Sequence, residues 1–249
     1  MQKDIETLKN KAISAGIDLR LDLDAIAARV RNFNNHYDEL TTFKSAIPLL
    51  LPAGYDRYDT SHDAIGAIQR DLIKLNARIL RSEGKSGLVS WNSNRWDYLD
   101  MYTSPPQGAA IQPISLNMMN KERRGCAFNL TNAEDTDKTI TVTINGLEEA
   151  GNPDLVKLYK VGCVDTATNI LVADLLQEIT KGPSGYTVDI PAGMTQQLWV
   201  EFAPIALPQG THAGTILAAD GAAISTINFN IMISRGFHFC FHRRLRLRI

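Results

Sequence analysis

Acidic side chains in turns are the first residues of this sequence that could support chemistry. Glu134, Asp135 and Asp137 lie close together and could hold calcium through oxygen ligands, but they lack the spacing of an EF-hand loop. Hydrolysis of a glycosidic bond needs two carboxylates that face each other on a rigid scaffold. Turn aspartates such as Asp56 and Asp59 occur mainly because they bond their own backbone. We therefore expect solvent-facing turns and no catalytic residues.

Histidine and cysteine offer one further metal-binding pattern. His238, Cys240 and His242 alternate, so on a strand they would point the same way and could bind zinc, but no fourth ligand is evident. Cys126 and Cys163 could form a disulfide if the protein is exported, although two small buried hydrophobic side chains are the simpler interpretation. The motifs of serine hydrolases, P-loop proteins and dinucleotide-binding proteins do not occur. We expect neither a metal site nor a cofactor.

Aromatic residues are the remaining candidates for ligand contact. Trp and Tyr present flat apolar faces with polar edges, on which sugar rings can stack. The same rings could instead pin their own segment against the rest of the molecule, and we favour this second interpretation. The candidate residues for contact with carbohydrate or with a neighbouring domain are Trp91, Trp96, Tyr98, Tyr102 and Trp199.

The elements that must position these residues begin with helices over residues 1–82. Apolar side chains recur at steps of three and four, most clearly from Ile26 to Leu40 and from Ile65 to Ile79. A break at Pro48 separates these two stripes, and their similar lengths predict an antiparallel helical hairpin. Two helices alone bury little apolar surface. The stripes must therefore meet the first helix, a partner chain or the strands that follow.

The rest of the chain changes character twice. Residues 83–112 are rich in Gly, Ser, Asn, Pro and aromatic residues, which predicts a connecting segment with aromatic anchors. From residue 113 to 233 the apolar period drops to two and turn signals recur, which is typical of an antiparallel immunoglobulin-like β-sandwich. Within it Leu198 and Val200 should face the core, so Trp199 should lie on the outer face. The predicted fold class is α+β.

The net charge, the apolar runs and the two ends of the sequence limit the kinds of partner and location that we expect. The net charge of −1 favours neither nucleic acid nor an anionic membrane surface. The longest apolar run, residues 47–51, is too short to cross a bilayer. Residues 234–249 form a basic tail of irregular pattern that we interpret as a disordered or non-native end, since a few terminal arginines would bind nucleic acid without selectivity. No signal peptide is visible, so the location of the protein stays open.

Three stretches together resemble a known arrangement. They are Trp96 to Pro106, Arg123 to Asn132, and Ile190 to Val200 with Pro208 to Gly214. The chain resembles, over about residues 1–233, the N-terminal part of large bacterial proteins that are themselves similar to glycoside hydrolases. In these proteins, which are often exported, a helical segment and an immunoglobulin-like sandwich precede a (β/α)₈ barrel.

The resemblance implies a non-catalytic accessory or spacer module. The partner would be the protein's own C-terminal domain, which this sequence lacks, or another protein chain. The sequence departs from the family after residue 233, where a barrel would follow, so the chain is expected to be truncated and no active-site residue of the family can be placed on it. Three alternatives stay open: a carbohydrate-binding module that uses exposed aromatic rings, an assembly protein whose helices pair between chains, and an enzyme with an unrecognised site.

Overall fold

The structure is a computed structural model with all side-chain atoms of the part that it describes. The described residues are 2–41, 64–97, 99–108, 111–147, 155–165, 171–203, 207–221 and 224–234. The break predicted at Pro48, the aromatic ring of Tyr98 and the tail beyond Ser234 lie outside these residues. The zinc pattern of His238, Cys240 and His242 therefore stays a prediction.

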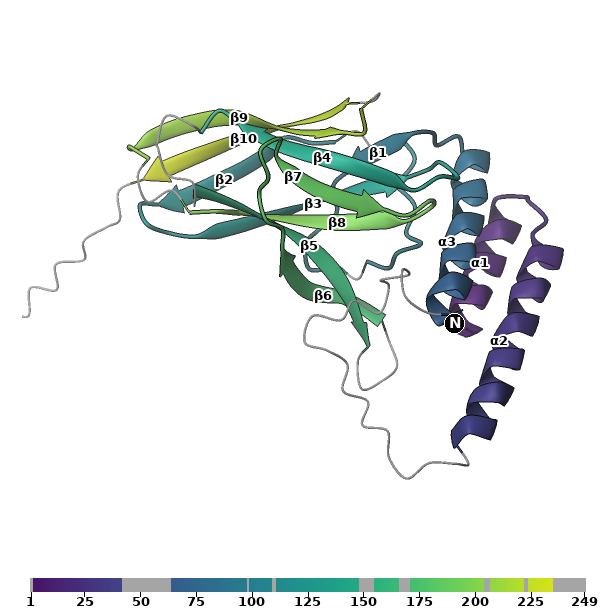
Figure 1. Cartoon of the computed structure of the whole chain (residues 1–249). Helices are drawn as coiled ribbons and strands as arrows, with labels where there is room; N and C mark the ends of the chain where they lie inside the picture. The colour runs from purple at the N-terminus through teal and green to yellow at the C-terminus, as the bar shows by residue number, and fades with distance from the viewer. Residues whose placement is uncertain are drawn as a thin grey trace, which may run out of the picture.

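The three helices of the described residues lie together at one end of the molecule (Figure 1). They are α1 (Gln2–Ser14), α2 (Arg20–Thr41) and α3 (Ala64–Ser82), and each of them contacts the other two. Gly16 adopts a φ of 70° just after α1, a left-handed conformation that glycine enters without strain. None of the described helices is both long and apolar enough to cross a membrane. The expected two-helix hairpin stays a prediction, because its connection lies outside the described residues.

In the described part of the chain, ten strands form two five-stranded sheets, with orders β1-β3-β8-β5-β6 (sheet A) and β2-β10-β9-β4-β7 (sheet B). The strands are β1 (Leu88–Trp91), β2 (Ile114–Met119), β3 (Arg124–Asn132), β4 (Lys138–Asn145), β5 (Val156–Asp165), β6 (Leu171–Glu178), β7 (Tyr186–Ile190), β8 (Thr195–Phe202), β9 (Gly210–Ala219) and β10 (Ile224–Ser234). The α+β class predicted from the sequence is confirmed.

The sheets depart from the sequence prediction in two respects. The prediction of a wholly antiparallel arrangement is wrong at one pair, because β2 runs parallel to β10 with Ile114 opposite Phe229. In addition, the segment at residues 83–112, expected only to connect, contributes β1, which pairs with β3 from Leu88 to Trp91. The direction of β2 and the formation of β1 both depend on pairing with another strand. A local pattern of alternating residues does not contain this information.

The core between the sheets is built from the alternation of β8 and β3. Leu198 lies opposite Phe128 and Val200 opposite Cys126, and all four side chains are buried. Across the sheets, the rings of Phe202 and Phe229 pack with their centroids 5.3 Å apart. Burial of large apolar side chains of this kind contributes about 1.5–3 kcal/mol each. The predicted inward face of β8 is therefore the face that joins sheet A to sheet B.

Helix α3 has two buried faces, and only one of them was predicted. Ile68, Leu72 and Leu75, from the predicted apolar stripe, are buried among the helices. The opposite face packs on the turn between β7 and β8, where Gly193 lies against the backbone of α3. A Cβ atom at Gly193 would lie 2.2 Å from the carbonyl oxygen of Ile73. The helices are thus joined to the strands through a contact that only glycine permits.

A buried polar pair completes this junction. The amide of Asn76, which is fully buried on α3, donates a hydrogen bond of 2.6 Å to the carbonyl of Gly193. The ammonium of Lys11 on α1 donates to Asn76 Oδ1 at 2.8 Å and to the carbonyl of Tyr102. Burial lowers the pKa of Lys11, and the nearby carboxylates of Glu83 and Asp100 act in the opposite direction. Two helices and two segments of the sandwich meet at these groups.

The two described cysteines are buried thiols, and the disulfide between Cys126 and Cys163 that the sequence left open does not form. They lie on β3 and β5, which are separated by β8 in sheet A. Burial raises the pKa of the Cys126 thiol to about 12, and the charge of Arg95 opposes this effect. The simpler interpretation, two small buried side chains, fits this arrangement.

The junction predicts a large effect for one polar residue. Replacing Asn76 with Ala should lower the free energy of unfolding by about 1–3 kcal/mol, because the Gly193 carbonyl and the Lys11 ammonium lose a buried partner. The measurement is urea denaturation followed by circular dichroism. Lys74→Ala, at an exposed position of the same helix, is the matched control and should change stability by less than about 0.5 kcal/mol. Equal effects of the two variants would contradict the junction.

The buried thiols predict a second result. In a Cys240→Ser variant at pH 8, the native protein should react slowly with a thiol reagent such as DTNB, because Cys126 and Cys163 are buried. Unfolding in guanidinium without a reductant should release both thiols. A count of zero reactive thiols in the unfolded protein would show a disulfide and refute the free state.

Candidate functional site

The aromatic candidates lie in very different surroundings. Trp91 and Tyr102 are both buried, with 3% of each side chain exposed. Trp199 is half-buried on the outer face of sheet A, whereas Trp96 is 75% exposed. Tyr98 lies outside the described residues. The structure therefore brings Trp96 and Trp199 to one surface and places Trp91 and Tyr102 beneath it.

Hydrogen bonds fix the segment after β1 on the outer face of sheet A. The indole of Trp91 donates to the hydroxyl of Thr131 at 2.9 Å. The hydroxyl of Thr195, which is 2.7 Å from that of Thr131, donates to the carbonyl of Thr103 at 2.6 Å. The amide of Thr195 also donates to the carbonyl of Met101 at 2.9 Å. These buried bonds hold the turn that carries Trp96 in a defined position.

Three side chains form the surface cluster that we call the Trp96 patch: Arg95, Trp96 and Trp199. The two indole rings meet edge to face, with centroids 6.2 Å apart and an angle of 65° between their planes. The guanidinium carbon of Arg95 lies 5.2 Å from the Trp96 ring and 5.7 Å from the Trp199 ring, within the range of cation–π attraction. Arg95 also donates a hydrogen bond to the carbonyl of Gly125. The cluster is therefore organised before any ligand arrives.

Gly125 on β3 makes room for this cluster. A Cβ atom at this position would lie 2.2 Å from Nε1 of Trp199, well inside the contact distance. The indole thus lies flat over the strand because its neighbour has no side chain. This role could not be predicted from the sequence, since an isolated glycine in a strand pattern indicates close approach without naming the partner.

Charged and polar residues surround the Trp96 patch. Tyr159 on β5 lies opposite Trp199 in the sheet register. Partial burial, followed by the carboxylates of Glu201 and Glu178, raises the pKa of the Tyr159 phenol, so it stays a neutral hydrogen-bonding group at physiological pH. Glu201 itself pairs with Arg123 at 3.1 Å. The rim of the patch is polar and its centre is aromatic, a composition common in protein interfaces.

The acidic side chains considered as calcium ligands each bind another group of the protein. Glu134 accepts a hydrogen bond from the backbone amide of Gly87, and Asp137 accepts one from the amide of Ala192 at 2.9 Å. Asp135 pairs with Arg81 on α3 at 3.5 Å. Each carboxylate therefore has a different partner. Among the described residues, no group of three or more His, Cys, Asp or Glu side chains could hold a metal ion.

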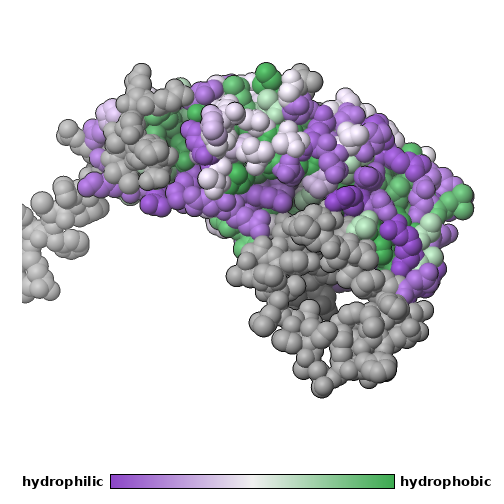
Figure 2. Space-filling view, viewed as in Figure 1, coloured by the Kyte–Doolittle hydropathy of each residue, from purple (hydrophilic) through white to green (hydrophobic). Residues whose placement is uncertain are grey.

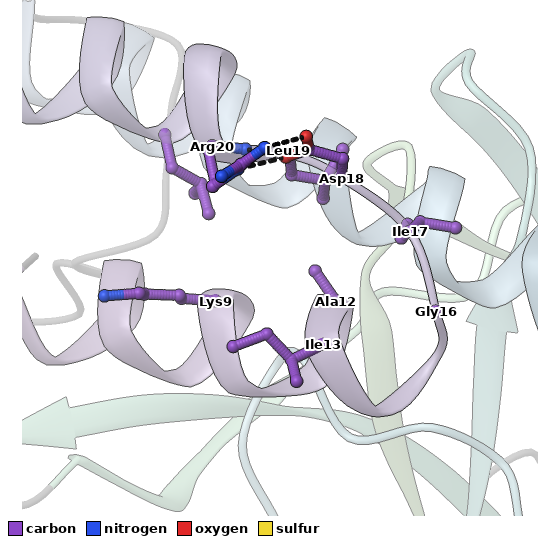
Figure 3. A pocket seen from close by; sticks show the side chains of 9 residues that line it. Lys9, Ala12, Ile13, Gly16, Ile17, Asp18, Leu19 and Arg20 are labelled. Carbon is purple, nitrogen blue, oxygen red and sulfur yellow. Dashed lines mark hydrogen bonds and ion pairs between the residues drawn. The ribbon is translucent and has the colours of Figure 1, made fainter.

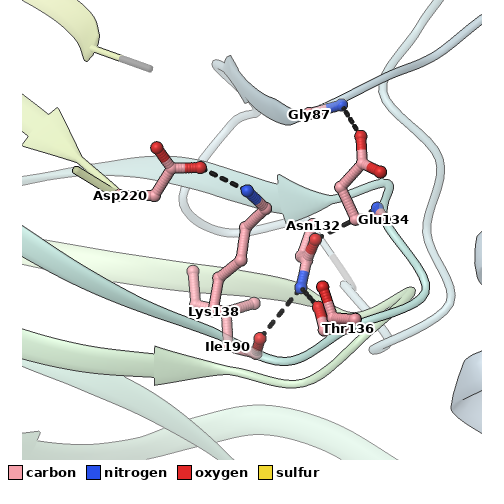
Figure 4. A network of polar contacts seen from close by, with 7 residues as sticks. All are labelled: Gly87, Asn132, Glu134, Thr136, Lys138, Ile190 and Asp220. Atoms are coloured by element: carbon pink, nitrogen blue, oxygen red, sulfur yellow. Dashed lines mark hydrogen bonds and ion pairs between the residues drawn. The ribbon is translucent and has the colours of Figure 1, made fainter. Parts of the chain in front are cut away.

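Figure 4 shows how the same region joins neighbouring segments. The side-chain amide of Asn132 donates to the carbonyls of Thr136 and Ile190, while Glu134 reaches Gly87. The ammonium of Lys138 pairs with Asp220, whose side chain is almost fully buried. These contacts link β4 to the turns beside β1, β7 and β9. The network stabilises turns and presents no pair of carboxylates across an open space.

An apolar pocket of about 360 Å³ lies between the end of α1 and the start of α2. Figure 3 shows Lys9 and Ile13 on α1, across the pocket from the ion pair of Asp18, in the connection before α2, and Arg20, the first residue of α2. Hydrogen bonds from Arg20 lower the pKa of Asp18 to about 2, so this carboxylate is ionised and already engaged. The residues that line the pocket include no nucleophile paired with a base.

Hydrophobic side chains are also visible on the helical surface. Figure 2 shows hydrophilic residues over much of the described surface in this view and hydrophobic residues at the helical end. Ile13 on α1 is 67% exposed and Leu21 on α2 is 87% exposed. Single exposed apolar residues are normal on protein surfaces. The Trp96 patch differs because aromatic rings and a cation are organised there together.

Comparisons with known proteins give no family for the chain. No protein-family model and no curated protein matches it. Among solved structures, a family 123 glycoside hydrolase from Clostridium perfringens is 9% identical with a TM-score of 0.45, over 60% of this chain and 28% of the hydrolase. A PapD-like domain of human CEP192 is 13% identical with a TM-score of 0.29, over 58% of this chain and 99% of that domain. Similarities this low assign no function.

The different exposure of the tryptophans predicts a spectroscopic result. Replacing Trp96 with Phe should remove most of the emission that acrylamide quenches, because this ring is 75% exposed. Trp91→Phe is the control and should leave the quenching almost unchanged, since Trp91 is 3% exposed. The measurement is the Stern–Volmer slope of each variant. Equal reductions in the two variants would place Trp96 inside the fold and remove the patch.

Proposed function

We propose that this chain is a non-catalytic accessory module of a carbohydrate-active, glycoside-hydrolase-like protein, and that it contacts a neighbouring protein domain through the Trp96 patch. The observation that carries the proposal is the exposed Trp96 ring, held edge to face on Trp199 with Arg95 over both rings. The carbohydrate-active context rests on the sequence resemblance alone. The partner is the C-terminal domain of the same protein or another chain.

The composition of the patch supports a protein partner. Tryptophan, tyrosine and arginine are the residues that most often dominate binding energy in protein interfaces. Such residues act best when they are rigid in the free protein, because little conformational entropy is then lost on binding. Gly125, Trp199 and the segment held by Thr195 supply this rigidity. The site is thus suited to receive a side chain of a folded partner.

Carbohydrate binding is the second candidate, and the exposure of Trp96 favours it. One sugar ring could stack on this indole. A longer glycan would need further rings in the same plane, but Trp199 is inclined by 65° and Trp91 is buried. The geometry therefore supports contact with a single sugar at most, and it fits a protein side chain better.

The main argument for assembly through the helices was that their apolar stripes needed a partner chain. Of the stripes that were expected to seek a partner chain, Ile26 and Val30 of α2 are buried in the same core as Leu72 and Ile79 of α3. A second copy is not needed to cover these four side chains. We therefore place the partner contact on sheet A.

The proposal can be tested with a photo-crosslinking amino acid. Benzoylphenylalanine at Tyr159, beside Trp199, should yield an adduct with one protein when the chain is expressed in its native host and irradiated. The adduct should be lost in a Trp96→Ala background, because the central ring of the contact is missing. The measurement is a mobility shift followed by mass spectrometry of the adduct.

A matched control uses Asn230, which is exposed on β10 of the other sheet. The crosslinker at this position should give no comparable adduct. Identical adducts from both positions, or none from Tyr159, would refute docking at the patch. If instead soluble polysaccharides shift the Trp96 emission of the purified protein, the carbohydrate-binding alternative is correct.

A further inference from the structure

Among the described residues, Arg95 differs from the arginines near it because it forms no ion pair. Arg123 pairs with Glu201 at 3.1 Å and Arg124 pairs with Glu122 at 2.7 Å. Among the described residues, no carboxylate lies within ion-pair distance of Arg95. Its contacts are the two indole rings and one backbone carbonyl. The Trp96 patch therefore presents a fixed positive charge between aromatic rings.

The position of the guanidinium makes it suitable for recognition. One N–H group is used by the Gly125 carbonyl, while the planar group has several further donors. The cation–π contacts with Trp96 and Trp199 limit the rotamers of a side chain that would otherwise be mobile, so less entropy is lost when it binds. A planar, pre-oriented guanidinium matches a carboxylate, with which it can form two parallel hydrogen bonds.

We propose that the partner of the Trp96 patch presents a carboxylate side chain to Arg95 and an adjacent apolar or aromatic side chain to Trp96. This inference rests on the proposed docking function and names the chemistry of the partner: an acidic residue next to a hydrophobic one on a protein surface. The partner's carboxylate is inferred from the positive charge of Arg95. Its hydrophobic neighbour is inferred from the Trp96 indole, which is 75% exposed. An acidic glycan could supply a carboxylate too, but the rings, inclined by 65°, provide no flat platform for it.

Charge variants of Arg95 in the Tyr159 crosslinking assay test this inference. Arg95→Gln should reduce the adduct about tenfold or more, as expected for the loss of a charged hydrogen bond, and Arg95→Glu should abolish it. Arg95→Lys should retain only part of the yield, because a lysine cannot form the two parallel bonds. Raising the salt concentration should weaken the wild-type contact and leave the Gln variant almost unaffected.

Arg20→Gln is the matched control, since it removes one exposed charge at the start of α2 and should leave the adduct unchanged. If Trp96→Ala abolishes the adduct while Arg95→Gln and Arg95→Glu retain it, the acidic partner is refuted and the docking function stands. If the wild type gives no adduct, the docking function itself fails. If no protein adduct forms and purified protein binds polygalacturonate in an Arg95-dependent manner, the carboxylate belongs to a glycan and the protein partner is refuted.

Discussion

The close contact between helix α3 and the turn at Gly193 holds the helices and the strands together. The backbone of this turn approaches α3 so closely that a Cβ atom would lie 2.2 Å from the Ile73 carbonyl. Such an approach leaves polar backbone groups without water, and Asn76 satisfies one of them at 2.6 Å. Because Lys11 binds the same asparagine and also the carbonyl of Tyr102, the contact sets the position of α1 and of the segment that follows β1. The helices and the strands consequently share one continuous core.

The two faces of sheet A illustrate how one strand can serve stability and recognition at once. Leu198 and Val200 of β8 point into the core, while Trp199 between them points outward. Part of the outer face is covered by the segment that Thr195 holds, and the remainder carries the Trp96 patch. The surface is rigid because its support is a hydrogen-bonded sheet and a pinned turn. A rigid support of this kind is what a recognition site requires, since the binding residues lose little freedom when a partner arrives.

Prediction from the sequence was correct for segments with a strong apolar periodicity. It was wrong where the structure depends on which distant segments pair or pack together. The alternation around Leu198 predicted the inward face of β8 correctly, and the stripe through Leu72 predicted one buried face of α3. The second face of α3 was missed because its centre is Asn76, a polar residue that interrupts the apolar pattern. The parallel pairing of β2 with β10 was missed for a different reason. Strand direction follows from the path of the chain between distant segments, and residue alternation is the same in both directions.

Residue patterns were enough to predict the secondary-structure class, the inward face of the main strands and the set of aromatic residues from which a site could be built. Which of these rings are exposed depends on how distant segments pack together. Trp91 and Trp96 are close in sequence and equal in chemistry, yet one is buried under a segment and the other is at the surface. Their difference arises from long-range contacts: Thr131 binds the first, while Trp199 supports the second. Local residue types cannot encode such contacts, because they depend on which distant backbone comes near.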